Sequence, residues 1–549
     1  MESSSNDITG KEILEHLKSI ESRISKVESY LNISSETSDY DAEEEVEIPK
    51  KKAGSEEELE FRIGQYWFAK LGISVFLIGW IFANTLPFEY LNQIIPVAIG
   101  FLAGMFVIAT SIFLKKRFPH IAGYVLGSGF VIIFLAAIRL HFFSPEPVLS
   151  QLIPVIVILY LVSLLLIFSG VKWNSPYIAA LGFSATLLSA LIGNYSYLIF
   201  FSIIFVAILS SNFKIKYSWN GLFNFAITSA YLVHLIWFIN NPLIGNSLEL
   251  KIDEPLNLLF ILIYQVIFSF GYFADKKYDE YLPTAISILA NTSIGYGLFL
   301  LITILSMPTL SQVYHLLAAF VFLGFAILFF TKKQSKIATF YYAMTGYAAL
   351  SVGIILQFDK PDYFMWLCWQ SLIVVSTAVW FRSKFIIVAN FFIFLLIFLV
   401  FLVISGTTSG ISLSFGIVAL LSARILNWKK DQLELQTEQM RNAYLVAALL
   451  IIPYSLYHMM PSEYVAFGWI AIAIIYYLLS VLLKNTKYRY MSIATYLMTV
   501  LYVLVIGITS EETTSKILSF LVVGTALIIL SIIYARNRNK ASSQKDSID

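Results

Sequence analysis

Residues 91–143 read LNQIIPVAIGFLAGMFVIATSIFLKKRFPHIAGYVLGSGFVIIFLAAIRLHFF. Two apolar runs, 91–114 and 120–143, flank a short basic turn at Lys115-Lys116-Arg117. A helix needs about 20 mostly apolar residues to cross the hydrocarbon layer of a membrane, because each residue advances it by about 1.5 Å. This stretch therefore predicts two transmembrane helices joined by a turn that stays in water.

The same alternation of apolar run and short turn continues along most of the 549-residue chain. Hydrophobic residues make up 58%, aromatic residues 16% and charged residues only 13%, whereas a soluble domain has roughly 25% charged residues. This composition excludes a soluble enzyme, a nucleic-acid-binding protein, a disulfide scaffold and a disordered regulator. It predicts an all-α, polytopic integral membrane protein with about 18 transmembrane helices. The predicted spans are residues 67–85, 91–114, 120–143, 150–169, 174–192, 196–211, 218–239, 256–273, 282–305, 311–330, 337–357, 363–381, 385–404, 407–423, 442–459, 464–483, 490–509 and 517–534.

The basic residues give an independent test of this topology. With a cytoplasmic N-terminus, 24 Lys and Arg residues fall in inner loops and the C-terminal tail, and three fall in outer loops: Lys251, Lys360 and Lys516. Cytoplasmic loops are enriched in Lys and Arg. We therefore expect a protein of the cell (inner) membrane with both termini cytoplasmic. Spans 174–192 and 196–211 are the least secure pair, since a re-entrant hairpin around Gly193-Asn194-Tyr195 is an alternative.

An acidic arm precedes the membrane body. Residues 1–60 hold 7 Lys and Arg against 17 Asp and Glu, and they lack the apolar core of a signal peptide. Within residues 10–31, apolar residues alternate at spacings of four and three, as in a coiled coil: Ile13, Leu17, Ile20, Ile24, Val27 and Leu31. We expect a cytoplasmic coiled-coil helix (1–31) that mediates homo-oligomerisation or docks a partner protein. The alternative is a lone amphipathic helix on the membrane or on the protein's own loops.

Four further regions follow this helix. Residues 32–57 form an acidic and then basic linker, 58–143 a glycine-rich segment with spans 1–3, 144–534 the remaining helix bundle and 535–549 a basic cytoplasmic tail.

The join between arm and body carries a recognisable set of residues. Glu60, Gly64, Trp67, Gly72 and Gly79 stand in EFRIGQYWFAKLGISVFLIGW, followed by GFLAG, KKR and GYVLGSGF. Residues 58–143 thereby resemble the bacterial family of membrane proteins known as domain of unknown function 2339. The resemblance implies a coiled-coil N-terminus and a many-helix membrane body, and it implies no activity.

Two glycine pairs suggest how spans 2 and 3 meet. Gly100 with Gly104, and Gly123 with Gly127, each place two hydrogen-only side chains on one helix face. Small residues allow helix backbones to approach closely in a membrane, where no hydrophobic drive exists between helices. We expect spans 2 and 3 to form a tightly packed pair. A flexible hinge is the alternative.

Charged residues inside a membrane are costly and therefore mark candidate sites. Arg139 is the only Lys or Arg well inside a predicted span, and no Asp or Glu lies within one except at its edges. Snorkelling of Arg139 to the outer headgroups is one interpretation. Binding of an anionic group, such as a lipid phosphate, is the other.

Four histidines fall at a similar outer depth: His141, His234, His315 and His458. Chance placement at the interface competes with an outward polar pocket that includes Arg139 and receives an anionic headgroup. Their spacing gives no metal signature, the single Cys368 excludes a disulfide or cysteine–metal cluster within one chain, and no cofactor motif is present. The deeper Asn224, Gln265, Asn291, Gln370 and Asn390 are expected to make interhelical hydrogen bonds rather than to bind ligands.

Three functions are compatible with these features. The first is transport or flipping of an anionic or amphipathic cell-envelope component. The second is a membrane scaffold that recruits partners through the coiled coil. The third is a lipid-substrate transferase using outer-loop acids such as Glu89 or Glu146, although no catalytic base and nucleophile accompany them. Membrane lipid is the expected partner in each case, and no catalytic residue is identified.

Overall fold

The protein's computed structural model describes residues 68–88, 90–144, 146–251, 256–274, 282–306, 310–405, 410–428, 437–462 and 464–509, together with residues 521, 524 and 525. The chain divides into two compact units, Met1–Phe68 and Ala69–Asp549, and the helices described here belong to the second, apart from the first residue of α3. The predicted coiled coil, the linker, nearly all of span 517–534 and the basic tail lie outside the described residues.

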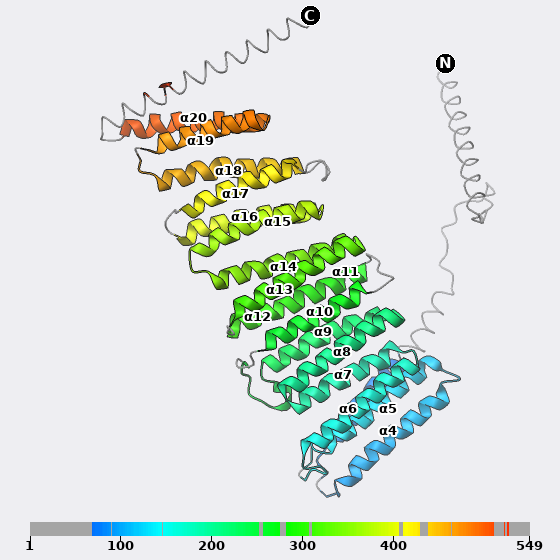
Figure 1. Cartoon of the computed structure of the whole chain (residues 1–549). Coiled ribbons are helices and arrows are strands. Elements are labelled where there is room, and N and C mark those ends of the chain that lie inside the picture. The colour runs from blue at the N-terminus through cyan, green and yellow to red at the C-terminus, as the bar shows by residue number, and fades with distance from the viewer. Residues whose placement is uncertain are drawn as a thin grey trace, which may run out of the picture. The chain divides into compact units, whose positions relative to one another are not determined.

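Helices follow one another along the chain (Figure 1). Their bounds are α3 (Phe68–Thr85), α4 (Ile94–Leu114), α5 (Pro119–Arg139), α6 (Leu152–Lys172), α7 (Pro176–Gly193), α8 (Ser196–Tyr217), α9 (Asn220–Phe238), η2 (Pro242–Ile244), α10 (Asn257–Phe273), α11 (Leu282–Leu289), η3 (Ala290–Ile294), α12 (Gly295–Ser306), α13 (Ser311–Leu328), η4 (Phe329–Lys333), α14 (Lys336–Gln357), α15 (Asp362–Trp380), α16 (Lys384–Ser405), α17 (Gly410–Trp428), α18 (Thr437–Met459), α19 (Val465–Leu482) and α20 (Thr486–Thr509).

Within the described residues, 15 helices are long and apolar enough to cross a membrane, and two shorter apolar helices cover Leu71–Thr85 and Asn257–Phe273. Helices satisfy every interior backbone hydrogen bond within one segment, which lipid requires. Helical secondary structure is therefore confirmed for this part of the chain, and its long apolar helices support a multi-pass membrane protein. Helices α7 and α8 are 18 and 22 residues long, which favours two crossings there over a re-entrant hairpin.

Neighbouring helices pair as hairpins. Helices α4 and α5, α6 and α7, α13 and α14, α17 and α18, and α19 and α20 make the most extensive contacts. Each hairpin also packs on the next, since α7 contacts α9, α8 contacts α10, and α15 contacts α17. The body is thus a series of helical hairpins in which a side chain meets mainly its own hairpin and the adjacent ones (Figure 1).

One type of turn closes several hairpins at the end that carries Lys or Arg residues. The helix ends at a left-handed residue, and the next residue caps the following helix through its side chain. Asn174, for example, has φ 48°, and the Oγ of Ser175 accepts a hydrogen bond from the backbone N–H of Ile178 at 3.5 Å. The same pairs recur at Gln334-Ser335, Arg382-Ser383 and Lys484-Asn485. A turn of this kind reverses the chain in two or three residues, so the loops stay short.

The glycines place α4 directly on α5. A Cβ added to Gly100 would lie 2.7 Å from the Cβ of Ala136, and one added to Gly104 would lie 2.5 Å from Cγ1 of Ile133. On α5 the glycine that faces α4 is Gly129, whose added Cβ would lie 3.0 Å from the carbonyl oxygen of Gly104. The other predicted pair, Gly123 and Gly127, does not face α4. Gly127 faces Leu181 of α7, and Gly123 has no neighbour within 4 Å.

Candidate functional site

Arg139 ends α5 and is one of the largest fully buried side chains in the described residues, with a relative exposure of 1%. One terminal nitrogen, Nη1, donates a hydrogen bond to the backbone carbonyl oxygen of Asn84. The other, Nη2, lies 3.5 Å from Oε1 of Gln93. The guanidinium carbon lies 4.9 Å from the centre of the Phe88 ring. Arg139 is therefore enclosed by the end of α3 and the connection between α3 and α4.

Two further hydrogen bonds position this enclosure. The Asn84 side chain donates to the carbonyl oxygen of Leu135 at 2.8 Å, which fastens α3 to α5. The Gln93 amide donates to the carbonyl oxygen of Phe88 at 3.1 Å, and Phe88 itself has a positive φ of 44°. The connection thus curls back on itself and lays the Phe88 ring against the guanidinium group.

The charge on Arg139 has only neutral partners among the described residues. Its Nε–H group is buried without a hydrogen-bond acceptor, and no carboxylate of the described residues forms an ion pair with it. A buried, uncompensated charge is costly in a medium of low dielectric. Because none of the described residues supplies a countercharge or an acceptor for this Nε–H group, the burial favours the anion-binding interpretation over snorkelling; an anion would supply both.

Two of the four histidines lie at exposed or partly buried positions. His141 follows α5, and its Nδ1 lies 2.9 Å from the carbonyl oxygen of Leu149. His458 is exposed in the last turn of α18, with ring centres of Tyr454 and Tyr457 at 4.6 and 5.0 Å.

The other two histidines are fully buried in different surroundings. His234 on α9 stacks on Phe200 at 5.1 Å between ring centres, and neither of its ring nitrogens has a hydrogen-bond partner among the described residues. His315 on α13 lies 3.0 Å from the hydroxyl of Tyr296 through Nδ1 and 3.1 Å from that of Thr303 through Nε2.

Within the part of the chain that the structure describes, no hydrogen bond or ring contact joins any two of Arg139, His141, His234, His315 and His458. His141 is near Arg139 in sequence, whereas the other three lie on separate hairpins with partners of their own. Contacts in this fold are mainly between adjacent hairpins. The similar depth predicted for these residues therefore brings none of them into contact with Arg139 among the described residues, and Arg139 stands as the candidate site without them.

The predicted interhelical hydrogen bonds are confirmed for Asn224, Asn291, Gln370 and Asn390. The prediction is wrong for Gln265, whose side-chain polar atoms have no hydrogen-bond partner among the described residues. Asn390 on α16 donates to Oγ of Ser371 on α15 at 2.8 Å and to the hydroxyl of Tyr444 on α18 at 2.9 Å. Such bonds link helices where lipid gives no hydrophobic drive.

A second Asn–Ser–Tyr cluster has the same composition two hairpins earlier. Asn291 in the π-helix η3 donates to Oγ of Ser269 on α10 at 3.2 Å and lies 3.5 Å from the hydroxyl of Tyr342 on α14. Its Oδ1 accepts a hydrogen bond from Tyr231 on α9 at 2.7 Å. In both clusters, asparagine joins a serine of its own hairpin to a tyrosine of the next hairpin.

Lys214 is a buried cation that the sequence interpretation placed in a loop. Helix α8 continues to Tyr217, and Lys214 is only 4% exposed on its last turn. Its Nζ lies 5.2 Å from the ring centre of Tyr272 and 5.7 Å from that of Phe223. The apolar Phe213 and Ile215 on either side were the available signal that the helix continues.

The described residues contain no group of three or more His, Cys, Asp or Glu side chains placed to hold a metal ion. Cys368 is buried with a free thiol. Comparisons of the chain with protein-family models, with curated proteins and with solved structures found no match. The resemblance to the family known as domain of unknown function 2339 therefore stays a prediction.

Proposed function

We propose that this protein transports or flips an anionic or amphipathic component of the cell envelope. One observation carries the proposal: Arg139 is buried at the end of a membrane helix, and all its partners among the described residues are neutral. A guanidinium group binds phosphate or carboxylate through two parallel hydrogen bonds. A phosphate-bearing headgroup is the chemistry that complements it.

The contacts of Arg139 suggest how binding and release could alternate. The 3.5 Å separation from Gln93 is long for a hydrogen bond, so an anionic oxygen would displace that amide at small cost. Asn84 and Gln93 belong to α3 and to the connection that follows it. Movement of this segment would therefore expose or cover the guanidinium group. Arg139 binds the headgroup in this proposal, and Asn84 and Gln93 cover its guanidinium group.

The proposed topology has 18 spans, both termini in the cytoplasm and the cell (inner) membrane as its location. The asymmetric placement of Lys and Arg supports it. We also propose that residues 10–31 form a coiled coil that joins copies of the chain or a partner protein. The four–three spacing of apolar residues supports this role.

A lipid-movement assay tests the proposed function. The full chain is reconstituted into liposomes with a fluorescent phosphatidylglycerol or a fluorescent polyprenyl phosphate, and the labelled lipid that reaches the opposite leaflet is measured. We expect the protein to accelerate movement of at least one probe, and Arg139→Gln to reduce that rate at least tenfold because it removes the charge.

Lys172→Gln is the matched control, because it removes an exposed basic residue at the opposite end of a neighbouring helix. Its rate should match wild type. The proposal is overturned if neither probe moves faster than in protein-free liposomes, or if Arg139→Gln moves lipid at the wild-type rate.

A further inference from the structure

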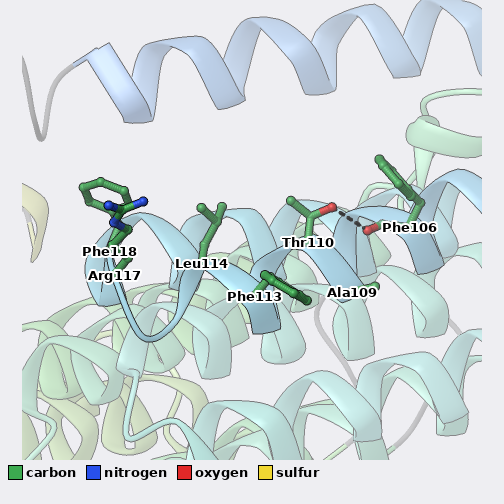
Figure 2. A pocket seen from close by; sticks show the side chains of 7 residues that line it. All are labelled: Phe106, Ala109, Thr110, Phe113, Leu114, Arg117 and Phe118. Carbon is green, nitrogen blue, oxygen red and sulfur yellow. Dashed lines mark hydrogen bonds between the residues drawn. The ribbon is translucent and has the colours of Figure 1, made fainter.

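A hollow of about 550 Å³ lies along one face of α4 and the turn that follows it. Five of its lining residues recur on one stripe of α4, and two come from the turn: Phe106, Ala109, Thr110, Phe113, Leu114, Arg117 and Phe118. Figure 2 shows Arg117 and Phe118 at one end of this row and Phe106 at the other. Except for Thr110 and Arg117, the lining side chains are apolar.

Among the described residues, only α4 and the turn after it line this hollow. The opposite side of α4 carries Gly100 and Gly104, which pack on α5. Phe106 and Phe113 in the hollow are 73% and 89% exposed. The Thr110 hydroxyl donates to the carbonyl oxygen of Phe106 at 2.9 Å, which leaves the surface of the hollow essentially apolar (Figure 2).

Arg117 supplies the charge at the end of the hollow. Its side chain is exposed and makes no hydrogen bond or ion pair with another described residue. The neighbouring Lys115 is engaged elsewhere, with its Nζ 4.1 Å from the centre of the Trp173 ring. A free guanidinium group beside an exposed apolar row is the complement of an anionic headgroup attached to an acyl chain.

We propose that this hollow binds one anionic phospholipid, with its phosphate on Arg117 and an acyl chain along Phe113 and Phe106. The acyl chain gains little by moving from bulk lipid to this surface, because both surroundings are apolar. Selection must therefore come from the charge–phosphate contact. Arg117 determines which headgroup is bound, and the apolar row determines how the chain is oriented.

The position of the hollow suggests that it loads lipid for transport, and this loading role rests on the proposed function. Arg117 precedes α5 and Arg139 ends it, and the 21 residues of α5 span about 31 Å at ~1.5 Å per residue. This length matches the hydrocarbon layer, about 30 Å thick. The hollow is thus the loading site in the inner leaflet, and Arg139 lies at the outer end of the same hairpin.

Photo-crosslinking in vesicles tests the lipid site directly. The photoreactive residue p-benzoylphenylalanine replaces Phe113 in the full chain, reconstituted in phosphatidylcholine with a minor fraction of phosphatidylglycerol. Mass spectrometry then gives the ratio of the two crosslinked lipids. We expect phosphatidylglycerol to be enriched about fivefold over its bulk fraction, and this enrichment to disappear when Arg117→Gln is added.

The matched control is Phe168 on α6. It lies four residues before Lys172, as Phe113 lies four residues before Arg117, and it is also exposed, but it does not line the hollow. Crosslinks from position 168 should show markedly weaker enrichment.

Two results overturn the proposed lipid site. The first is that crosslinks at position 113 show the same lipid ratio as the bulk membrane. The second is that phosphatidylglycerol is equally enriched at positions 113 and 168, which would indicate a general layer of anionic lipid. Neither measurement requires lipid movement. Failure of the transport assay with enrichment intact would leave the lipid site standing and remove only its loading role.

Discussion

Asn390 on α16 donates a hydrogen bond of 2.9 Å to the hydroxyl of Tyr444 on α18, 54 residues later in the chain. Asn291 lies 3.5 Å from the hydroxyl of Tyr342, 51 residues later, in an equivalent pair of hairpins. An asparagine thus faces a tyrosine of the next hairpin at two places, with a shorter contact at Asn390 than at Asn291. This recurrence provides internal comparisons for testing what holds the membrane body together.

The contact between Asn390 and Tyr444 should contribute measurably to stability. We expect Asn390→Ala to lower the free energy of unfolding by about 1–2 kcal/mol, since it removes hydrogen bonds to Tyr444 and Ser371. Reversible unfolding of the full chain in mixed micelles measures this change. A double-mutant cycle with Tyr444→Phe should give a coupling of about 0.6–1.7 kcal/mol. Additive effects would show that the two side chains do not stabilise each other.

Two buried glutamines should respond in opposite directions to replacement by leucine. The Gln370 amide donates to the carbonyl oxygen of Tyr347 at 2.9 Å and to Ser351 at 3.0 Å. Neither polar atom of the Gln265 side chain has a partner among the described residues. Gln370→Leu should therefore destabilise the protein by about 1 kcal/mol, whereas Gln265→Leu should leave stability unchanged or raise it.

The same unfolding assay in micelles measures both glutamine variants. If Gln265→Leu lowered the free energy of unfolding as much as Gln370→Leu does, the Gln265 side chain would have to make stabilising hydrogen bonds, contrary to its surroundings among the described residues.

Glycines 104 and 123 should differ in their tolerance of a methyl group. A Cβ at position 104 would lie 2.5 Å from Cγ1 of Ile133 and 2.9 Å from the carbonyl oxygen of Gly129. Gly104→Ala should therefore separate α4 from α5 and lower the midpoint of thermal unfolding. Gly123→Ala meets open space and should leave that midpoint unchanged or raise it slightly, because alanine favours helix over glycine. Equal midpoints for the two variants would contradict close packing at Gly104.

The proposed sidedness can be tested with single cysteines. Cys368 is fully buried, so the unmodified chain should resist a membrane-impermeant maleimide. In intact cells, Ser247→Cys in the predicted outer loop should be labelled, and Lys484→Cys in the predicted inner turn should be labelled only after the cells are opened. Labelling of both cysteines in intact cells, or of Lys484→Cys alone, would refute the topology.

Local composition was sufficient to locate the long apolar helices of the described residues. The predicted span 196–211 and helix α8 begin at the same residue, and span 363–381 differs from α15 by one residue at each end. The physical reason is that lipid cannot satisfy a backbone hydrogen bond, so each long apolar run must become a helix whatever its neighbours are. A charged residue was a less reliable marker of a helix end. Lys214 lies outside the predicted span 196–211, yet α8 continues past it to Tyr217.

Partners of individual side chains were decided by the tertiary structure. Sequence spacing indicated that two glycine pairs, Gly100 with Gly104 and Gly123 with Gly127, would pack spans 2 and 3 together. The packing shows that only the first pair meets α5, that Gly127 meets α7, and that an added Cβ on Gly123 meets nothing within 4 Å. Apolar helices of similar composition fit one another in many arrangements, since lipid gives none a hydrophobic advantage. The enclosure of Arg139 likewise depends on Asn84, 55 residues earlier. The sequence alone determined where the long apolar helices of the described residues lie, and three-dimensional packing decided which helices meet and which polar groups they enclose.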